Sequence, residues 1–405
     1  MSAAGSAPPA DDRVRRYSDR LLPPGETWAR IEPHLFSHGI TRMARLTGLD
    51  RIGLPVWSAA IPNARSLSVA QGKGLTDEEA KVSAAMEALE RVVAGSPFPG
   101  PLLASARELR AAGLRAETLP SLTAAGMEDL DAADPAEWVA GTDIRTGEPV
   151  HLPLQAVALD RTARGLRFWQ SSDGLASGNG PDEAVFHALL ERIERDAEAL
   201  WLIGTLRARA ASRFDPADLG DPLIDSLVDR VRSAGLAPVF MDMTSDTAIP
   251  AILCHIGPGD IGARSRIARR EVTAGGGAHP DPVRAAIRAV TEAAQSRLTF
   301  ISGARDDIED AHYRDALPEG ARDLFLAPCS RPRRWNCTVG TIDAMTRDIL
   351  SRLDRTGCGP AYRVALADPA LPFAVEKVIA PGLENPPGAR LRRFGSRALL
   401  KAVRG

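Results

Sequence analysis

The sequence predicts an α+β fold in which strands and long helices form one compact unit. A strand-like segment, a glycine-rich turn and an amphipathic helix follow one another three times, with helices beginning near residues 76, 181 and 281. The chain has 405 residues, of which 44% are hydrophobic, so it can bury a large core. The three units share no fixed period, which argues against a solenoid.

The charge balance argues against a function that depends on a global electrostatic field. Fifty Lys and Arg residues are balanced by 52 Asp and Glu residues, and the formal net charge is −2. Nucleic acid and anionic membranes are therefore not expected as partners. No apolar run reaches the roughly 20 residues of a membrane helix, the N-terminus lacks a signal-peptide pattern, and the four cysteines form no CxxC pair. We expect a cytoplasmic protein with reduced thiols and a local functional site.

The first unit is predicted from residue 54 onward. Residues 1–25 are rich in Ala, Pro, Ser, Asp and Arg, a composition typical of a mobile tail. Residues 54–61 form an apolar strand candidate and residues 66–70 an alternating one. Residues 71–75, Gln-Gly-Lys-Gly-Leu, then predict a turn.

The first long helix is predicted to begin after Thr76 and to extend to about Val93. Thr76 is a capping residue, and the three acidic residues that follow it favour a helix N-terminus. Residues 95–135 contain several prolines and short helical pieces, which predict a surface insertion over the core.

The second unit begins with strand-like segments at 138–140 and 150–154. The glycine-rich loop 171–180 then leads into a helix whose first residue is Pro181, a position where the missing N–H costs nothing.

The third unit repeats this order. Residues 238–243 and 249–256 read as buried strands, and the glycines 275–277 precede a helix from about 281 to 298. Mixed helices and strands throughout the chain follow from these three units.

Two of the helices carry the sequence Glu-x-x-Glu-Arg, at residues 87–91 and 191–195. At about 100° per residue, the acidic side chains of each helix fall on one stripe. Each stripe can be a solvated face with intrahelical Glu–Arg pairs. Alternatively, the stripes face each other, and carboxylates about 4 to 5 Å apart would then repel by a few kcal/mol unless a cation lay between them. Mg²⁺ prefers such oxygen ligands.

Only four of the 50 basic residues are lysines, and Lys73 lies between Gly72 and Gly74. These glycines would let the backbone approach a ligand, and the ammonium would be a point charge for phosphate. The pattern is not a P-loop, and a turn with an exposed lysine is the alternative. With the acidic helices it suggests a metal–nucleotide site, whereas Lys81, Lys377 and Lys401 are expected at the surface.

Several motifs occur in one order between about residues 50 and 385. They are Gly72-Lys73-Gly74, Ser83-x-x-x-Glu87-x-x-Glu90-Arg91, Ala176-x-Gly178-Asn179-x-x-x-Glu183, Glu191-x-x-Glu194-Arg195, Thr291-Glu292-x-x-Gln295-x-Arg297 and Val378-Ile-Ala-Pro-Gly382. Together they resemble the YcaO family of ATP-dependent peptide-modifying enzymes.

The resemblance implies a YcaO-type fold over residues 26–405, with mixed β-sheets and long acidic helices around a central site for ATP and Mg²⁺. The residues that it implies in cofactor binding are Lys73, Ser83, Glu87, Glu90, Arg91, Asn179, Glu183, Glu191, Glu194, Arg195, Glu292, Gln295 and Arg297. Those that it implies as Mg²⁺ ligands are Glu87, Glu90, Glu183, Glu191 and Glu194. No catalytic residue is assigned. The family commonly has Asn-Gly where this chain has Asp173-Gly174, which leaves the role of Asp173 open.

The chemistry that the resemblance implies is phosphorylation of a peptide amide oxygen by ATP, so that this oxygen departs as phosphate. A Ser, Thr or Cys side chain as nucleophile gives an azoline, and a sulfide equivalent gives a thioamide. Cyclising members commonly end in a P-x-P-x-P tail, which is absent here, and residues 54–74 resemble the branch paired with TfuA proteins.

We therefore favour thioamide formation on a ribosomally made precursor peptide, with a TfuA-like partner that delivers sulfur. The tail before residue 25 is too short for a leader-binding domain, so a separate partner would recognise the peptide, and the family tendency predicts a homodimer. Three alternatives stay open: an azoline-forming cyclodehydratase, a nucleotide-binding accessory factor for ribosomal protein methylthiolation, and a relative that has lost ATP.

Overall fold

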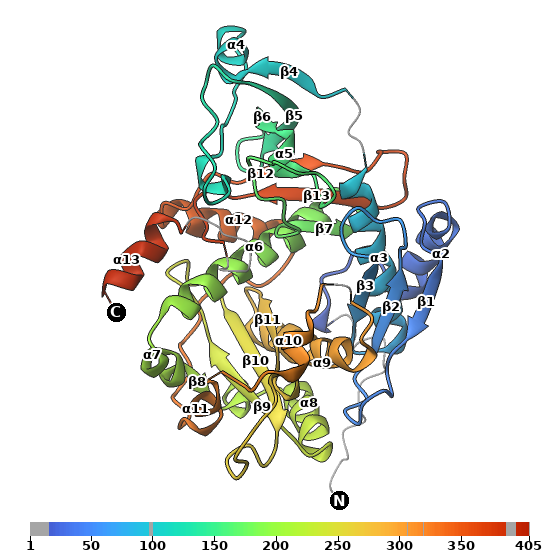
Figure 1. The fold of residues 1–405 in the computed structure, drawn as a ribbon, viewed down its shortest axis with the longest axis vertical. Coiled ribbons are helices and arrows are strands. Elements are labelled where there is room, and N and C mark those ends of the chain that lie inside the picture. The colour runs from blue at the N-terminus through green and yellow to red at the C-terminus, as the bar shows by residue number, and fades with distance from the viewer. Residues whose placement is uncertain (1–15, 97–99, 306, 319, 386–393, 405) are drawn as a thin grey trace, which may run out of the picture.

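The computed structural model describes residues 16–96, 100–305, 307–318, 320–385 and 394–404. Within these ranges the strands form three antiparallel sheets, and each sheet packs against one long helix (Figure 1). The predicted order of strand and helix thus recurs three times, and the fold is α+β as expected.

The first sheet has the strand order β1-β2-β3 and packs against α3, with α2 beside it (Figure 1). The bounds of these elements are α2 Pro24–Leu35, β1 Arg42–Arg45, β2 Val56–Ala60, β3 Val69–Lys73 and α3 Asp77–Gly95. Helix α3 begins with a complete capping box, because Thr76 and Glu79 each bond the other's backbone N–H.

The second sheet has six strands in the order β4-β5-β12-β13-β7, with β6 paired to β5. The bounds of the strands are β4 Leu102–Ser105, β5 Pro135–Asp143, β6 Pro149–Pro153, β7 Leu175–Gly178, β12 Tyr362–Ala365 and β13 Ala374–Ile379. The helices associated with this part of the chain are α4 Ala106–Ala111, α5 Leu154–Val157, α6 Pro181–Ile203, α12 Ile342–Arg355 and α13 Ser396–Arg404. Strand β4, which lies in the segment predicted as a surface insertion, forms one edge of this sheet at the top of Figure 1.

The third sheet has the order β11-β10-β9-β8 and packs against α9. The bounds of its strands are β8 Arg213–Phe214, β9 Leu236–Asp242, β10 Ala251–Pro258 and β11 Thr273–Ala278. The helices of this part are α7 Leu206–Ala211, α8 Pro222–Ser233, α9 Pro282–Ser302, α10 Asp310–Arg314 and α11 Ala321–Leu326.

The three helix–sheet units meet at the centre of the molecule. Each long helix packs on its own sheet and also contacts a strand of the next unit: α3 contacts β7, α6 contacts β11, and α9 contacts β3. Helix α6 lies between the second and third sheets, which is why side chains on most of its faces are buried. This arrangement brings the two acidic stripes and the third helix to one place.

The glycine-rich segments lie partly in strands, where turns were expected. Strand β3 continues through Lys73, which pairs with Val56, so the predicted turn at 71–75 is wrong for residues 71–73. A Cβ on Gly72 would lie 2.0 Å from the backbone N of Ala84 in α3, and one on Gly275 would lie 2.2 Å from that of Ala293 in α9. These glycines let a strand approach a helix backbone, and their role is in packing.

Two further expectations differ from the structure. Residues 16–25, assigned to the mobile tail, contact the body of the protein, and Pro24 already begins α2; residues 1–15 lie outside the described part. Lys377, expected at the surface, is buried. Its ammonium replaces the lost contacts with water by donating to the backbone oxygens of Ser171 at 2.5 Å and Asp173 at 2.8 Å. The four cysteines are free thiols.

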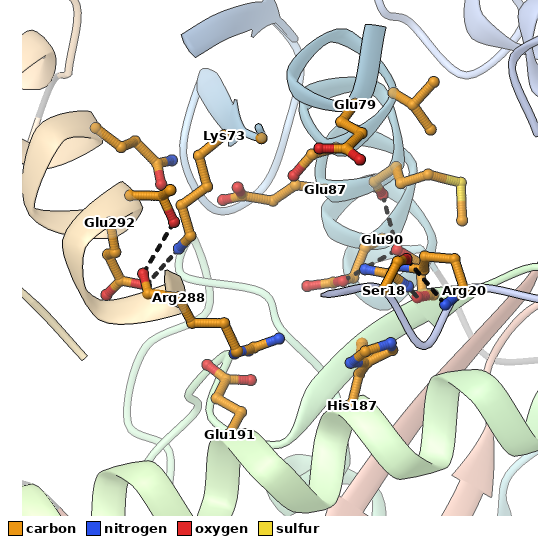
Figure 2. Close-up of a pocket in the computed structure, with 18 of the residues that line it drawn as sticks. Ser18, Arg20, Lys73, Glu79, Glu87, Glu90, His187, Glu191, Arg288 and Glu292 are labelled. Atoms are coloured by element: carbon orange, nitrogen blue, oxygen red, sulfur yellow. Dashed lines mark hydrogen bonds and ion pairs between the residues drawn. The ribbon is translucent and has the colours of Figure 1, made fainter. Parts of the chain in front are cut away.

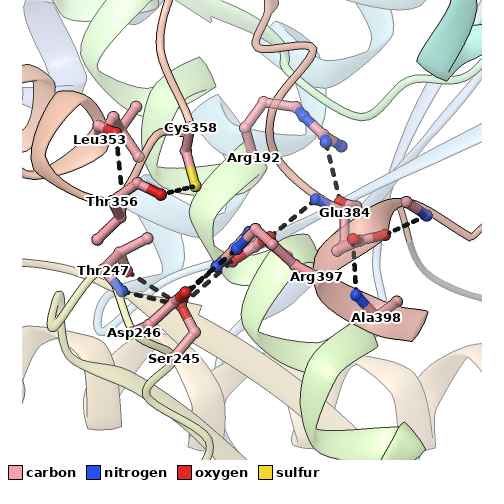
Figure 3. Close-up of polar contacts among 12 residues, drawn as sticks. Arg192, Ser245, Asp246, Thr247, Leu353, Thr356, Cys358, Glu384, Arg397 and Ala398 are labelled. Carbon is pink, nitrogen blue, oxygen red and sulfur yellow. Dashed lines mark hydrogen bonds and ion pairs between the residues drawn. The ribbon is translucent and has the colours of Figure 1, made fainter. Parts of the chain in front are cut away.

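A buried ion pair ties the C-terminal helix α13 to α6 (Figure 3). The guanidinium of Arg397 donates to both oxygens of Asp196, a fully buried carboxylate, and also contacts Asp246. The backbone N–H of Glu384 donates to Asp196 at 2.8 Å, and the carboxylate of Glu384 accepts from the backbone N–H of Ala398 at 2.8 Å. Despite Arg397, burial raises the pKa of Asp196.

We expect Arg397→Ala to lower the free energy of unfolding by about 3 to 5 kcal/mol at neutral pH, because it leaves Asp196 as an unpaired buried charge. Chemical denaturation measures this loss. The deficit shrinks as the pH falls, since protonation removes the charge of Asp196. Arg347→Ala is the matched control, because the pair of Arg347 with Asp343 lies at the surface and is expected to contribute less than about 1 kcal/mol. Equal losses in the two variants would contradict the prediction.

Candidate functional site

A central cavity of about 830 Å³ lies where the three units meet. Its walls come from β3, α3, α6 and α9, together with residues 17–24 from the N-terminal side (Figure 2). All the predicted cofactor residues except Arg297 line it: Lys73, Ser83, Glu87, Glu90, Arg91, Asn179, Glu183, Glu191, Glu194, Arg195, Glu292 and Gln295. Tertiary packing therefore brings together residues from three distant parts of the chain.

The acidic stripes of α3 and α6 face each other across this cavity. Burial raises the pKa of Glu90 well above its ordinary value, and the nearby carboxylates of Glu87 and Glu191 add to this rise. Burial likewise raises the pKa of Glu191 to about 7, although Arg195 opposes the shift. Arg91 offsets part of the charge on α3, since its Nη2 lies 2.8 Å from Oε1 of Glu87. The sequence left two interpretations of the acidic stripes, intrahelical Glu–Arg pairs or stripes that face each other. The structure contains both.

The third side of the cavity carries an alternating set of charges. Lys73 pairs with Glu292, and this ammonium holds the pKa of Glu292 below its ordinary value even though burial opposes the shift. Burial and the charge of Glu292 raise the pKa of Glu194. The guanidinium of Arg195 lies 3.7 Å from Glu194. Cationic side chains thus lie directly beside the acidic ones.

Glu183 and Asn179 line the cavity but are engaged by the N-terminal segment. Oε1 of Glu183 accepts from Arg20 at 2.8 Å, and its Oε2 accepts from the backbone N–H of Leu21 at 2.9 Å. Asn179 donates to both of these oxygens at 3.3 and 3.1 Å, and its own Oδ1 accepts from Thr27 at 2.9 Å. Both oxygens of a predicted metal ligand are therefore already hydrogen-bonded.

The motif on α9, which runs from Thr291 to Arg297, differs from the prediction at one residue. Arg297 does not line the cavity, and its Nε lies 3.5 Å from Oδ2 of Asp50. Helix α9 instead presents Arg284 and Arg288 to the cavity, and Arg288 lies one turn before Glu292 (Figure 2). The spacing of four residues could have revealed Arg288, because such residues share a helix face. Gln295 lines the cavity while its amide donates to the backbone oxygen of Gln71 at 2.8 Å.

His187 is a second cavity residue that the sequence analysis missed. It is buried on α6 between Glu183 and Glu191, and neither ring nitrogen has a hydrogen-bond partner among the described residues. Burial lowers its pKa well below the ordinary value, and the charges of Arg20 and Arg288 add to this effect. The imidazole is therefore neutral, and both of its nitrogens are buried.

Asp173 lies between two guanidinium groups, those of Arg192 at 3.9 Å and Arg195 at 4.0 Å. Its negative charge also raises the pKa of Glu191. Asp173 thus belongs to the electrostatic surroundings of the α6 glutamates.

Comparisons with known proteins identify the family of this chain. A model of the YcaO cyclodehydratase family, described as ATP- and Mg²⁺-binding, matches residues 71–384. The chain belongs to the YcaO family. ATP and Mg²⁺ are therefore the cofactors of its family, as the resemblance implied.

Relatives of this YcaO protein cover nearly its whole length. It is 41% identical to an uncharacterized protein in the tfuA 3′ region of Rhizobium leguminosarum bv. trifolii, over 99% of this chain and 97% of the relative. It is 34% identical to an uncharacterized protein of Mycobacterium tuberculosis strain H37Rv, over 94% of this chain and 85% of the relative.

Solved structures show the same fold. YcaO from Methanopyrus kandleri, bound with AMPPCP and Mg²⁺, matches with a TM-score of 0.70 at 23% identity, over 93% of this chain and 96% of that chain. A heterocyclase in complex with substrate and cofactor matches with a TM-score of 0.71 at 22% identity. That match covers 90% of this chain and 53% of the heterocyclase, so this YcaO protein spans about half its length.

The cavity of this YcaO protein fits Mg²⁺ and ATP by the chemistry of its side chains. Burial is the main cause of the raised pKa values of Glu90, Glu191 and Glu194, and neighbouring acidic groups add to the rise. No three His, Cys, Asp or Glu side chains within the described ranges gather closely enough to hold a metal ion by themselves. Mg²⁺ is usually held by one or two carboxylates together with phosphate oxygens. The cavity provides both carboxylates and cations for such a complex.

Among the helices in the described ranges, none combines the length and apolar character that a membrane crossing needs.

We expect Mg²⁺–ATP binding to release protons near pH 7. Glu191 has a pKa of about 7 without ligand, and a bound cation favours its ionised form. Affinity therefore rises between about pH 5.5 and 7.5, by at most about tenfold per pH unit for one group, and levels off above this range. Calorimetry in two buffers with different ionisation enthalpies counts the released protons. Tighter binding at the acidic end would contradict the assignment.

Proposed function

We propose that this protein uses ATP and Mg²⁺ to activate a backbone amide of a ribosomally made precursor peptide and that the product is a thioamide. The observation that carries the proposal is the relative in the tfuA 3′ region, which is 41% identical over nearly the whole chain. A TfuA-like protein is accordingly the proposed partner, and a small peptide is the proposed substrate. The microcin synthetase complex of E. coli with pro-MccB17 bound shares the fold, with a TM-score of 0.62 at 17% identity.

The reaction exchanges one oxygen atom for sulfur. A sulfide equivalent adds to the amide carbon, the amide oxygen takes the γ-phosphoryl group of ATP, and ADP is released. Loss of phosphate then breaks the bond between this carbon and its oxygen, the carbon–sulfur bond becomes the double bond of the thioamide, and the proton of the added sulfide passes to solvent. The bound Mg²⁺ would offset the charge that develops on the transferred phosphoryl group.

In this proposal, each group of side chains in the cavity binds one part of the Mg²⁺–ATP complex. Glu87, Glu90, Glu191 and Glu194 would hold Mg²⁺, because they are the carboxylates on the facing helices. Lys73, Arg195 and Arg288 lie beside them and would contact the phosphates. His187 lies in the same wall as a neutral hydrogen-bonding group.

Mass spectrometry tests the proposal directly. The protein is incubated with ATP, Mg²⁺, sulfide, a TfuA-like partner and the short peptides encoded near its gene. We expect a peptide that has exchanged oxygen for sulfur, with ADP and phosphate formed in equal amounts. Lys73→Ala is expected to lose the reaction, and Lys81→Ala to keep it, because the ammonium of Lys81 lies over the ring of Trp28 and does not line the cavity.

Each other outcome has a distinct meaning. Loss of one water from the peptide indicates azoline formation and overturns the thioamide assignment while keeping amide activation. ATP binding without any change in the peptide overturns peptide modification and favours an accessory role. Absence of ATP binding in the unaltered protein overturns the proposed site.

A further inference from the structure

A segment outside the family match closes one side of the cavity. The family model matches residues 71–384, whereas every residue from Tyr17 to Pro24 lines the cavity. We call residues 17–24 the strap. Helix α2 follows it directly, so the strap is held at its C-terminal end by the packing of Ile31 and Leu35 in the core.

Two networks of polar contacts hold the strap, and we call them latches. The first latch centres on Asp19. Its carboxylate lies 2.9 Å from Nε2 of His279 and pairs with Arg284, and Asp19 is only 9% exposed. Burial opposes ionisation of this group, but His279 and Arg284 hold the pKa of Asp19 below its ordinary value. Tyr17 adds a contact next to this latch, since its hydroxyl donates to Asp221 at 3.0 Å. These contacts fix the strap to the N-terminal end of α9 and to the residue that caps α8.

The other latch is the network of Glu183 and Asn179 at the N-terminal end of α6. Glu183 is fully buried, and its two oxygens are hydrogen-bonded to Arg20, to the backbone of Leu21 and to Asn179. Thr27 in α2 extends the network through Asn179. A carboxylate already bonded in this way is suited to holding a chain segment.

The two latches place Arg20 inside the cavity (Figure 2). Its Nη1 donates to Glu183 and, at 3.2 Å, to the backbone oxygen of Ser177. Its side chain remains 44% exposed. Its positive charge acts on other groups of the cavity: it lowers the pKa of His187 and opposes the rise in the pKa of Glu79.

We propose that Arg20 contacts the phosphates of the bound nucleotide and that Glu183 and Asn179 position it by anchoring the strap. The inference rests on the proposed ATP site. A guanidinium presents a planar fork of donors that matches phosphate oxygens. The hydrogen bonds of the Arg20 side chain to Glu183 and to the backbone of Ser177 are both made by Nη1. The strap thus supplies a cation opposite Lys73 and Arg288, so that the polyphosphate would be held from two sides. His187, whose two ring nitrogens have no hydrogen-bond partner among the described residues, lines the same cavity.

Calorimetry with Mg²⁺–ATP and with adenosine tests the role of Arg20. We expect Arg20→Ala to weaken ATP binding about 10- to 100-fold, the usual range for a charged hydrogen bond, and to leave adenosine binding unchanged. Arg20→Lys keeps the charge and should recover part of the affinity. The matched control is Arg16→Ala, because Arg16 pairs with Asp221 next to the strap and does not line the cavity. It should bind both ligands like the parent.

The outcomes separate this inference from the proposed function. If Lys73→Ala loses ATP binding but Arg20→Ala binds ATP as tightly as the parent, the role of Arg20 is wrong and the ATP site stands. Equal losses for ATP and adenosine in Arg20→Ala would indicate a structural role only and would also overturn the inference. If the parent itself does not bind ATP, the proposed function fails. Hydrogen exchange of residues 17–24 in the unaltered protein gives an independent check, because ATP is expected to slow it.

Discussion

Glu191→Gln is expected to weaken Mg²⁺–ATP binding on the order of 100-fold while the unliganded protein becomes more stable. The amide cannot supply the negative charge that a cation needs. The same change removes a carboxylate that burial and its neighbours disfavour, as its pKa of about 7 shows. Glutamine can still accept the hydrogen bond from the backbone N–H of Gly174, which Glu191 accepts at 3.1 Å. Affinity and stability should therefore change in opposite directions.

The pH dependence of stability tests whether the charge of Glu191 destabilises the folded protein. Because the pKa of Glu191 is raised in the folded state, the parent loses stability as the pH rises from the ordinary carboxyl pKa through about 7. The variant lacks this loss, so its advantage in melting temperature should be small at acidic pH and largest at alkaline pH. Asp182→Asn is the control, since Asp182 is exposed on the same helix and does not line the cavity. A variant that binds ATP normally, or melts lower at alkaline pH, contradicts the assignment.

Gly72→Ala is expected to destabilise the protein by about 3 kcal/mol and to weaken nucleotide binding with it. The added methyl group would lie 2.0 Å from the backbone N of Ala84 and 2.3 Å from the carbonyl oxygen of Ala80. Neither backbone atom can move away without shifting α3 from β3. The next residue is Lys73, so any such shift also moves its ammonium away from Glu292.

Chemical denaturation and ATP calorimetry measure the two effects of Gly72→Ala. Gly340→Ala is the matched control, because a Cβ at Gly340 meets nothing within 4 Å and its backbone is not left-handed. We expect this control to retain both stability and affinity. If Gly72→Ala unfolds at the same denaturant concentration as the parent, the close approach of strand and helix is not required.

The composition of the cavity could be predicted largely from motif spacing. Glu87, Glu90, Glu191 and Glu194 repeat at helical intervals on two segments, and such intervals place side chains on one face of a helix. Their convergence could not be derived from either helix alone, because a solvated stripe has the same spacing. The resemblance to the YcaO family supplied this step, and the family match and the cavity geometry agree with it.

The residues that were misplaced or missed depend on packing between distant segments. Arg297 and Arg288 are both basic residues of α9, and only the orientation of that helix directs Arg288 into the cavity and Arg297 toward Asp50. Arg20 lies in a segment whose Pro-rich composition resembles a mobile tail, yet Glu183 and His279 hold that segment in place. Local sequence does not encode a latch whose two halves are more than 160 residues apart.

The sequence by itself determined the three units of strand and helix, the acidic stripes on two of the helices and the resemblance to the family. These features are local, since helical spacing, capping residues and motif order can be read within one segment. The tertiary structure decided which carboxylates share the cavity and raise one another's pKa, and which are already bonded to a neighbouring segment. It also decided that Gly72 serves the contact between β3 and α3. Electrostatic interaction and steric exclusion depend on distance in space, which only the packed fold sets.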